Sequence, residues 1–571
     1  MRLASVVTLV GILMCCNGYA GERLIGGYTP EEAYRLGEQI FRNGLKPDGT
    51  PIQALLGSDI PMSGDMATCV SCHRRSGIGS VEGDIIAWPI TGKELFTPRR
   101  RTGAWNPNAQ PHRSGLVQRR ELPEAFQVEH ARPAYTDESL AVLIRTGVDP
   151  TGRNLGFSMP KFSLNDQEME ILVNYLKTLS PENDYSPGVD KETLRFATVI
   201  TDDVSETDKK AMLDVLQAHV RARNTQTRPH KKRVTSGPFY KTESFSAYRT
   251  LKLYLWELKG EPDSWDQQLT DYYNANPVFG LLGGISTRTW EPIHRFSERL
   301  KIPTILPITD QPVVSDKDWY TLYFSKGYYQ EGESVAAFIR ELNDKKKYKK
   351  IIQIFDRNSG GELFAKGYTD NRSDQAELIN IDLSVVNLED AKQSLGQLDE
   401  QSILLLWIDA EKRLSFLNKI NDSGLSHSPI FISAGYFSDL QKQKIPENIK
   451  DNIYLTHSIS LPEENKQKEF IVSRWLQREG IEKTNFSIQA KMYFLGWMLP
   501  GALRHMRSEF YRDYFMERFD MMTDQNYAIA VYPRLTFASG QRYLAKGCYI
   551  VKLNPDASNN ELVKVSDWNT N

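Results

Sequence analysis

Hydrophobic residues recur at helical spacing in three segments of the first third of the chain. The first segment begins with Thr29 and Pro30, a cap and a first-turn residue typical of a helix start. Its apolar face consists of Ala33, Leu36, Gly37, Ile40 and Phe41. The same spacing predicts a helix between Thr136 and Gly147 and another after Asn165. We expect Gly37 to let two of these helices cross closely, in a small helical domain.

Beyond residue 190 the pattern changes to short apolar runs separated by helical segments. Predicted strands occupy 194–201, 278–283, 303–308, 350–356, 403–409 and 429–433, and predicted helices include 333–342 and 414–421. This alternation favours parallel sheets built from βαβ units. About 390 residues are too many for one such sheet, so we expect two α/β lobes.

The N-terminus has the pattern of a secretory signal peptide. A basic Arg2 precedes an almost wholly apolar stretch at 3–16, and Gly18-Tyr19-Ala20 is a small-x-small cleavage pattern. The apolar stretch is short for a membrane anchor, and we expect no integral membrane segment after cleavage. We therefore divide the chain into a signal peptide (1–20), an N-terminal domain (21–180), a turn-rich linker (181–190) and an α/β domain (191–571), and expect a periplasmic location.

Composition narrows the function classes. The chain has 571 residues, of which 70 are Lys or Arg and 72 are Asp or Glu, for a net charge of −2. This balance creates no global basic field, which argues against nucleic-acid binding. Five cysteines are too few for a disulfide scaffold of this size. No G-x-S-x-G, H-E-x-x-H or P-loop sequence indicates a hydrolase or a transferase.

The strongest chemical signal is Cys69-Val70-Ser71-Cys72-His73, the C-x-x-C-H attachment sequence of haem c. Each thiol can add to a haem vinyl group, and the next residue supplies an imidazole to the iron. A zinc site would need four ligands, and no second C-x-x-C is present. A thiol redox pair would need a βαβ context, which the surrounding sequence lacks.

The sixth ligand of such an iron must come from elsewhere in the chain. We favour Met159, which precedes Pro160 just before the last helix of the domain, because a thioether in a loop is a soft axial ligand. Met62 and Met66 are competitors on the stretch that carries the attachment motif. His112 and His130 would instead give bis-His ligation.

Residues from about 28 to 180 resemble a class I cytochrome c. The resemblance rests on the C-x-x-C-H motif, Met159-Pro160, Tyr175-Leu176 and the sequence Gly-Glu-Gln-Ile-Phe at 37–41. It implies an all-α domain with one covalent haem c, His73 and Met159 as axial ligands, and one-electron transfer with a redox partner protein. The span from His73 to Met159 is long for this family.

Within that span, residues 95–120 hold no Asp or Glu and contain a cluster of arginines. The cluster consists of Arg99, Arg100, Arg101, Arg113, Arg119 and Arg120. Such a cluster can dock an acidic redox partner or neutralise haem propionates, or it is an ordinary solvated loop.

The chain from about 192 to 555 resembles a type-1 periplasmic binding protein of the branched-chain amino-acid receptor class. The best matches are the sequence Val-Phe-Gly-Leu-Leu-Gly-Gly-Ile-Ser-Thr at 278–287 and the strand at 302–307. The resemblance implies two hinged lobes that close over a small ligand, and no catalytic residues. Candidate ligand-binding residues are Ser286, Thr287, Asp310 and Ser359. Asp310 stands where a hydroxyl residue is expected, so an ordinary aliphatic amino acid is a doubtful ligand.

These features predict a multidomain protein: a class I cytochrome c domain, then a two-lobed α/β domain. The preferred function is a periplasmic one-electron carrier whose second domain binds a small ligand or docks a partner. Two alternatives are a solute receptor or sensor with an accessory haem, and an electron-accepting subunit of a periplasmic dehydrogenase system.

Overall fold

Two compact units make up the chain, Met1–Glu182 and Asn183–Asn571. The computed structural model describes residues 23–57, 59–82, 85–99, 131–155, 159–179, 186–236, 249–345, 347–422, 428–436, 445–506, 509–522, 529–538, 540–553 and 562–570. The expected signal peptide and most of the arginine cluster lie outside these ranges. Among the helices of the described ranges, none has the length and apolar composition needed to cross a membrane.

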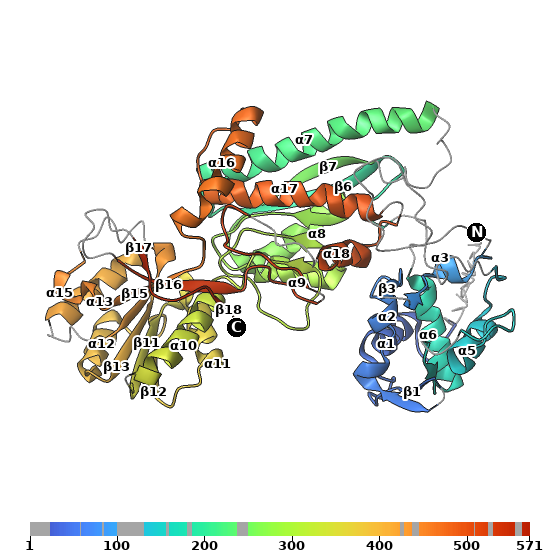
Figure 1. Ribbon diagram of the computed structural model, residues 1–571, viewed down its shortest axis with the longest axis horizontal. Helices are drawn as coiled ribbons and strands as arrows, with labels where there is room; N and C mark the ends of the chain where they lie inside the picture. Colours follow the sequence, from blue (N-terminus) through green and yellow to red (C-terminus); the bar gives the residue numbers. More distant parts are fainter. Residues whose placement is uncertain are drawn as a thin grey trace, which may run out of the picture. The chain divides into compact units, whose positions relative to one another are not determined.

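Three helices frame the N-terminal unit (Figure 1), and all three were predicted. They are α1 (Pro30–Asn43), α5 (Asp137–Thr146) and α6 (Asp166–Thr178). The Thr29 hydroxyl caps α1 by accepting a hydrogen bond from the Glu32 amide at 3.3 Å. At the start of α6, Asn165 and Glu168 cap each other's backbone amides at 2.9 and 2.8 Å. The apolar faces of the three helices meet in one core that includes Phe41, Leu143 and Leu172.

Helices α1 and α6 cross closely at Gly37, as predicted. A Cβ atom on Gly37 would lie 2.5 Å from the Cβ of Tyr175 and 2.9 Å from the Ile171 carbonyl oxygen. Both distances are far below van der Waals contact, so only glycine permits this crossing.

The expectation of an all-α domain was too narrow, because the N-terminal unit also contains two small antiparallel sheets. One has the order β2 (Ile60–Ser63), β1 (Gln53–Leu56), β5 (Lys161–Phe162), and the other pairs β3 (Ser80–Glu82) with β4 (Ile85–Ala87). The remaining elements of the described residues in this unit are single turns: η1 (Gly64–Ala67), α2 (Val70–His73) and α3 (Gly92–Leu95). Strands this short and irregular carry no clear alternation of apolar and polar residues, which is why the sequence pattern missed them.

The first lobe of the C-terminal unit is a parallel five-stranded sheet, in the order β10-β9-β8-β6-β7. Its strands are β6 (Thr193–Thr201), β7 (Thr250–Leu258), β8 (Gly280–Leu282), β9 (Thr304–Ile305) and β10 (Thr321–Leu322). Helices α8 (Trp265–Ala275) and α9 (Glu291–Leu300) pack on one face of the sheet through a core rich in tryptophan. Helices α7 (Glu206–Ser236) and α17 (Phe486–Met506) run side by side (Figure 1), and α18 (Arg512–Asp520) follows α17.

The second lobe is an eight-stranded mixed sheet, in the order β12-β11-β13-β14-β15-β16-β17, with β18 paired to β16. The parallel strands are β11 (Lys350–Phe355), β12 (Glu377–Asp382), β13 (Ser402–Trp407), β14 (Ile430–Ser433) and β15 (Ile453–His457). The antiparallel strands are β16 (Gly547–Leu553), β17 (Leu562–Lys564) and β18 (Asn569–Thr570).

Helices cover both faces of this second sheet. Successive strand residues point to opposite sides, and the strands carry apolar residues on both sides. Ile351 and Leu405 face α10 (Tyr328–Lys345) and α11 (Gly361–Asn371). Ile352 and Leu404 face α12 (Leu388–Gln393), α13 (Ala410–Asp422) and α15 (Glu447–Lys450). Each of the six runs predicted as strands contains a strand, and the two predicted helices lie within α10 and α13. The expectation of two α/β lobes is confirmed.

The chain passes between the two lobes three times. It leaves the first lobe after β10 and enters the second through α10. It returns after β15 through α16 (Pro462–Glu479) into α17, and it crosses a third time into β16. In open α/β sheets, ligand sites are built from the loops at the carboxyl ends of the parallel strands. We therefore expect any ligand site to lie at these ends in each lobe.

The close crossing of α1 and α6 is testable by substitution. Gly37→Ala forces the two helices apart, with an expected cost of about 1–3 kcal/mol from overpacking. Amide hydrogen exchange of residues 30–43 and 166–178, measured by mass spectrometry, should become faster in the variant. Gly501→Ala in α17 is the matched control, since a Cβ there meets nothing within 4 Å. Unchanged exchange in α1 and α6 would contradict the assigned crossing.

Candidate functional site

One helical turn carries the three residues of the attachment motif. Helix α2 spans Val70–His73, and Cys69 precedes it with helical dihedrals, φ −67° and ψ −32°. The His73 amide donates to the Cys69 carbonyl oxygen at 2.9 Å, which closes the turn. Residues three and four apart lie on one face of a helix, so Cys69, Cys72 and His73 share a face. Cys69 is half-buried and Cys72 is exposed.

The His73 ring is oriented by a backbone carbonyl. Its Nδ1 lies 2.9 Å from the Trp88 carbonyl oxygen. A carbonyl only accepts, so Nδ1 carries the proton and donates, and Nε2 keeps a lone pair. Burial lowers the pKa of His73 to about 4, which keeps the imidazole neutral at physiological pH. A neutral imidazole with one nitrogen fixed by a hydrogen bond is the form that binds iron.

Apolar side chains adjoin this turn. Met159, Met62, Leu155, Cys69 and Val70 are partly buried and pack against the same core of the N-terminal unit. Among the proposed sixth ligands, Met159 and Met62 therefore both lie beside the helical core, whereas Met66 is 66% exposed. His112 and His130 lie outside the described residues. The choice of Met159 stays a prediction.

These residues fit a haem c group. Two thiols and an imidazole share one face of α2, the imidazole is neutral with Nε2 available, and thioethers and aliphatic side chains supply an apolar surround. Within the described ranges, no cluster of three or more His, Cys, Asp or Glu side chains could hold a separate metal ion.

One arginine contacts the residue that orients His73, and a second arginine holds the first. The Arg99 guanidinium lies 4.6 Å from the centre of the Trp88 ring. Arg132 pairs with Arg99 through two backbone hydrogen bonds of 2.9 and 3.1 Å. The buried Arg132 side chain donates to the carbonyls of Glu94 and Pro133 at 2.6 and 2.9 Å. Of the predicted arginine cluster, Arg99 thus stabilises Trp88, while the other members lie outside the described residues.

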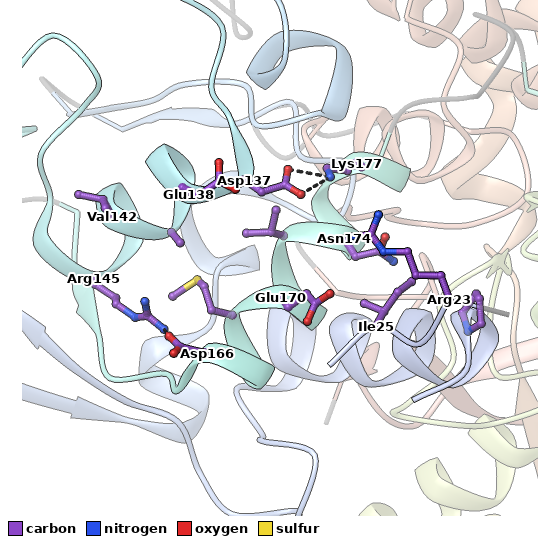
Figure 2. A pocket seen from close by; sticks show the side chains of 14 residues that line it. Arg23, Ile25, Asp137, Glu138, Val142, Arg145, Asp166, Glu170, Asn174 and Lys177 are labelled. Carbon is purple, nitrogen blue, oxygen red and sulfur yellow. Dashed lines mark hydrogen bonds and ion pairs between the residues drawn. The ribbon is translucent and has the colours of Figure 1, made fainter. Parts of the chain in front are cut away.

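A cavity of about 660 Å³ in the N-terminal unit lies between α5, α6 and residues 23–30 (Figure 2). Its charged rim is internally neutralised: Lys177 pairs with Asp137, and Arg145 with Asp166, each at 2.7 Å. Glu170 accepts the Gly26 amide at 3.0 Å. The lining contains no residue of the attachment motif, so this cavity is distinct from the haem site.

In the C-terminal unit, Thr287 already has a carboxylate partner. The Asp203 carboxylate accepts the Thr287 amide at 2.8 Å and also accepts the Thr287 hydroxyl. Burial opposes ionisation of Asp203, but hydrogen bonds from the Thr287 amide and hydroxyl favour the carboxylate, and the pKa of Asp203 is lowered. The amide and hydroxyl of Thr287, a candidate ligand-binding residue, are therefore occupied by a side chain of this chain.

The other candidate ligand residues are held by local contacts. The buried Ser286 hydroxyl accepts the Arg288 amide at 3.2 Å, and the Ser359 hydroxyl donates to the Asp356 carbonyl oxygen at 3.1 Å. Asp310 is exposed, and its backbone carbonyl accepts the Tyr328 amide at 2.9 Å.

Gln311, which the sequence analysis did not single out, links the two lobes. Its Nε2 donates to the Thr287 carbonyl oxygen at 3.0 Å in the first lobe. In the second lobe, a Cβ on Gly360 would lie 2.8 Å from the Gln311 Cδ, and Gly360 has φ +79°. Thr287, Gln311 and the turn that carries Ser359 are thus neighbours. The only signal in the sequence was the position of Gln311 beside Asp310.

A buried carboxylate lies at the same junction. Glu331, in the first turn of α10, accepts hydroxyl hydrogen bonds from Ser433 at 2.7 Å and from Thr456, at the ends of β14 and β15. Burial raises the pKa of Glu331 to about 7, and the charge of Asp310 adds to the shift. Asp310 also helps to raise the pKa of Lys491 against the opposing effect of burial. Asp310 therefore lies near charged groups from α10 and α17.

Comparison with known proteins is consistent with the site in the N-terminal unit. Residues 65–180 match the family model described as cytochrome c. No curated protein matches the chain.

Several solved structures resemble the chain. A fatty acid ABC transporter substrate-binding protein from Thermomonospora curvata is 13% identical with a TM-score of 0.44, and the match covers 67% of this chain and 94% of that one. A possible leucine/isoleucine/valine-binding protein from Rhodopirellula baltica is 15% identical with a TM-score of 0.44, covering 66% and 97%. The branched-chain amino acid transporter substrate binding protein LivJ from Streptococcus pneumoniae, in complex with isoleucine, is 13% identical with a TM-score of 0.43, covering 66% and 100%.

The cytochrome c match implies a haem c group and is consistent with an extracytoplasmic location. The chain thus joins a cytochrome c domain at residues 65–180 to an α/β unit structurally similar to substrate-binding proteins of ABC transporters.

Proposed function

We propose that this protein is a periplasmic one-electron carrier that holds a single haem c, covalently bound through Cys69 and Cys72. The observation that carries the proposal is the α2 turn, on which both thiols share a face with a His73 ring fixed by the Trp88 carbonyl at 2.9 Å. Haem iron, when bound, supplies reversible one-electron oxidation and reduction. The proposed signal peptide at 1–20 would deliver the chain to the compartment in which c-type haem is attached.

The residues around the motif each have a part in this function. Trp88 fixes the tautomer and the orientation of His73, and Arg99 stacks on the Trp88 ring. Met159 is the proposed second axial ligand, and its thioether would favour the reduced iron. The exposed position of Cys72 places one attachment point at the surface, where a redox partner protein can approach.

We further propose that the α/β unit binds a small ligand between its lobes, near Ser286, Thr287, Asp310 and Ser359. The contacts of Gln311 with both lobes support this placement. Asp203 already occupies the Thr287 amide and hydroxyl, so a ligand carboxylate would have to displace an ionised side chain. Cationic or polyhydroxy ligands fit better, because Asp203 and Asp310 are acceptors.

Covalent attachment is tested with cysteine variants. Wild-type protein purified from periplasm should show the mass of one haem that survives denaturation and acid extraction. Cys69→Ser/Cys72→Ser should lose it entirely, because no thiol of the attachment motif remains to add to the vinyl groups. Cys548→Ala, which removes a buried cysteine of the other unit, should keep it. Covalent haem in the double variant would refute the assignment.

The second axial ligand is tested by comparing two methionines. Met159→Ala should abolish the weak far-red absorption band of ferric, Met-ligated haem. Its potential should fall by on the order of 100 mV, a fraction of the range that axial ligands span. Met62→Ala should preserve both properties, since Met62 packs against the same core without, in our assignment, touching the iron. The opposite pattern would identify Met62 as the ligand.

The cleft is tested by calorimetry with a panel of amino acids, amines and polyols. Asp310→Asn should weaken binding of a cationic ligand about tenfold or more, because a charge-assisted hydrogen bond contributes about 1.5–3 kcal/mol. Asp422→Asn, at the far end of α13, is the charge-matched control and should have no effect. Tight binding of leucine or valine to the wild type would contradict a diverged pocket.

A further inference from the structure

Two of the segments that connect the lobes run side by side. One follows β10, and the other leads into β16. The Tyr323 amide donates to the Arg542 carbonyl oxygen at 2.8 Å, and the Ala545 amide donates to the Phe324 carbonyl oxygen at 2.7 Å. A cavity of about 400 Å³ lies on these segments and on the first turns of α10. This volume is within the range of about 300–1,000 Å³ typical of small-molecule sites.

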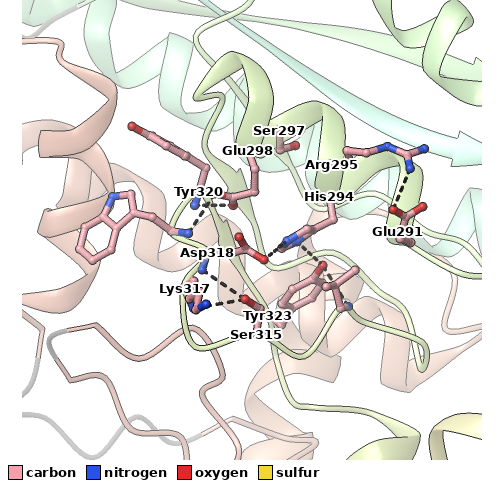
Figure 3. A network of polar contacts seen from close by, with 12 residues as sticks. Glu291, His294, Arg295, Ser297, Glu298, Ser315, Lys317, Asp318, Tyr320 and Tyr323 are labelled. Carbon is pink, nitrogen blue, oxygen red and sulfur yellow. Dashed lines mark hydrogen bonds and ion pairs between the residues drawn. The ribbon is translucent and has the colours of Figure 1, made fainter. Parts of the chain in front are cut away.

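A polar network holds one wall of this cavity in place (Figure 3). His294 contacts the Tyr323 hydroxyl through Nδ1 and Asp318 through Nε2, each at 2.9 Å. Tyr323 stacks on Tyr543, with ring centres 5.8 Å apart, and the Tyr543 hydroxyl accepts the Ser315 amide at 2.9 Å. Ser315 and Tyr543 line the cavity, so its shape is set by groups whose positions are already fixed.

Most charges at the cavity are paired. Lys326 lies 3.2 Å from both carboxylate oxygens of Glu333. Arg542 lies 2.5 Å from the buried carboxylate of Asp520. The remaining acidic residue of the lining, Asp316, is exposed.

Lys546 is the exception. Among the described residues it forms no ion pair, and its ammonium group contacts only the Gln541 side-chain carbonyl. Its pKa is lowered by burial and by the positive charges of Arg534 and Lys326. Arg534 is exposed and has no ion-pair partner in the described part of the chain. Lys546 therefore lies close to two other cations, Arg534 and Lys326, and has no ion-pair partner among the described residues.

We propose that this cavity binds a small, multiply charged anion that bears phosphate or carboxylate groups. Lys546 and Arg534 would supply positive charge that no ion pair among the described residues neutralises. Lys326 would be a third cation near the anion while it keeps its ion pair with Glu333. Such an anion relieves the repulsion among these cations, and charge-assisted hydrogen bonds to lysine and arginine are the strong ones. The site is separate from the proposed cleft at Thr287 and independent of the haem.

The location gives the site a consequence for the lobes. Lys326 belongs to the segment that follows β10, and Lys546 directly precedes β16. An anion that contacts both cations bridges two of the three connections between the lobes. Binding there is therefore linked to any change in the lobe arrangement that moves these segments.

Isothermal titration calorimetry of the full chain with inorganic phosphate and with citrate, at constant ionic strength, tests the proposal. At least one anion should bind the wild type, and Lys546→Met should weaken that binding tenfold or more while keeping most of the side-chain volume. Lys347→Met, at an exposed lysine that forms no ion pair with the described residues, is the matched control and should leave the affinity unchanged.

Two results would overturn the proposed anion site. Absence of binding of both anions to the wild type, or undiminished affinity in Lys546→Met, overturns the site. If Lys546→Met does not fold, as judged by circular dichroism, the exposed Arg534→Met variant replaces it. Undiminished affinity in Arg534→Met then has the same consequence. Because neither measurement depends on haem or on a ligand in the cleft, failure here leaves the proposed function untouched.

Discussion

The hydrogen bond from His73 Nδ1 to the Trp88 carbonyl is the interaction on which the chemistry of the N-terminal unit depends. A helical turn by itself leaves an imidazole free to rotate and to exchange tautomers. The carbonyl acceptor selects the tautomer in which Nε2 keeps its lone pair, and burial keeps the ring neutral. The same carbonyl belongs to a tryptophan held by Arg99, so the ligand geometry is supported by groups outside the attachment motif.

The helical frame around this turn is equally constrained. Helices α1 and α6 approach so closely at Gly37 that their backbones leave no room for a side chain. Their apolar faces then form one core, and Met159, Met62 and Val70 pack against its margin. Two small antiparallel sheets accompany the helices. This arrangement explains why the unit combines the helices expected of a class I cytochrome with strands that were not expected.

In the C-terminal unit, the dominant constraint is the need to satisfy polar groups where the lobes meet. Asp203 accepts both donors of Thr287, and Glu331 accepts two hydroxyls. Gln311 donates to the Thr287 carbonyl oxygen in its own lobe and packs beside Gly360 of the other lobe. A ligand entering here competes with partners that are already in place, which favours chemistry unlike that of a simple carboxylate. Lys546, by contrast, lines a cavity and forms no ion pair with any acidic side chain in the described part of the chain.

The sequence alone determined the features that are local along the chain. The C-x-x-C-H motif predicted Cys69, Cys72 and His73 as the haem-attachment residues, and apolar periodicity located the three helices and six of the strands. Sequence patterns did not single out Asp203, whose carboxylate accepts both the amide and the hydroxyl of Thr287.

Tertiary structure decided the rest. The partner of His73 is a backbone carbonyl fifteen positions away, and every residue has such a group, so no sequence pattern could mark Trp88. Lys326 and Lys546 line the same cavity although they lie 220 positions apart in the sequence. Such contacts depend on how the chain crosses between its lobes, and that path follows from the packing of whole sheets and helices rather than from the residues near any one site.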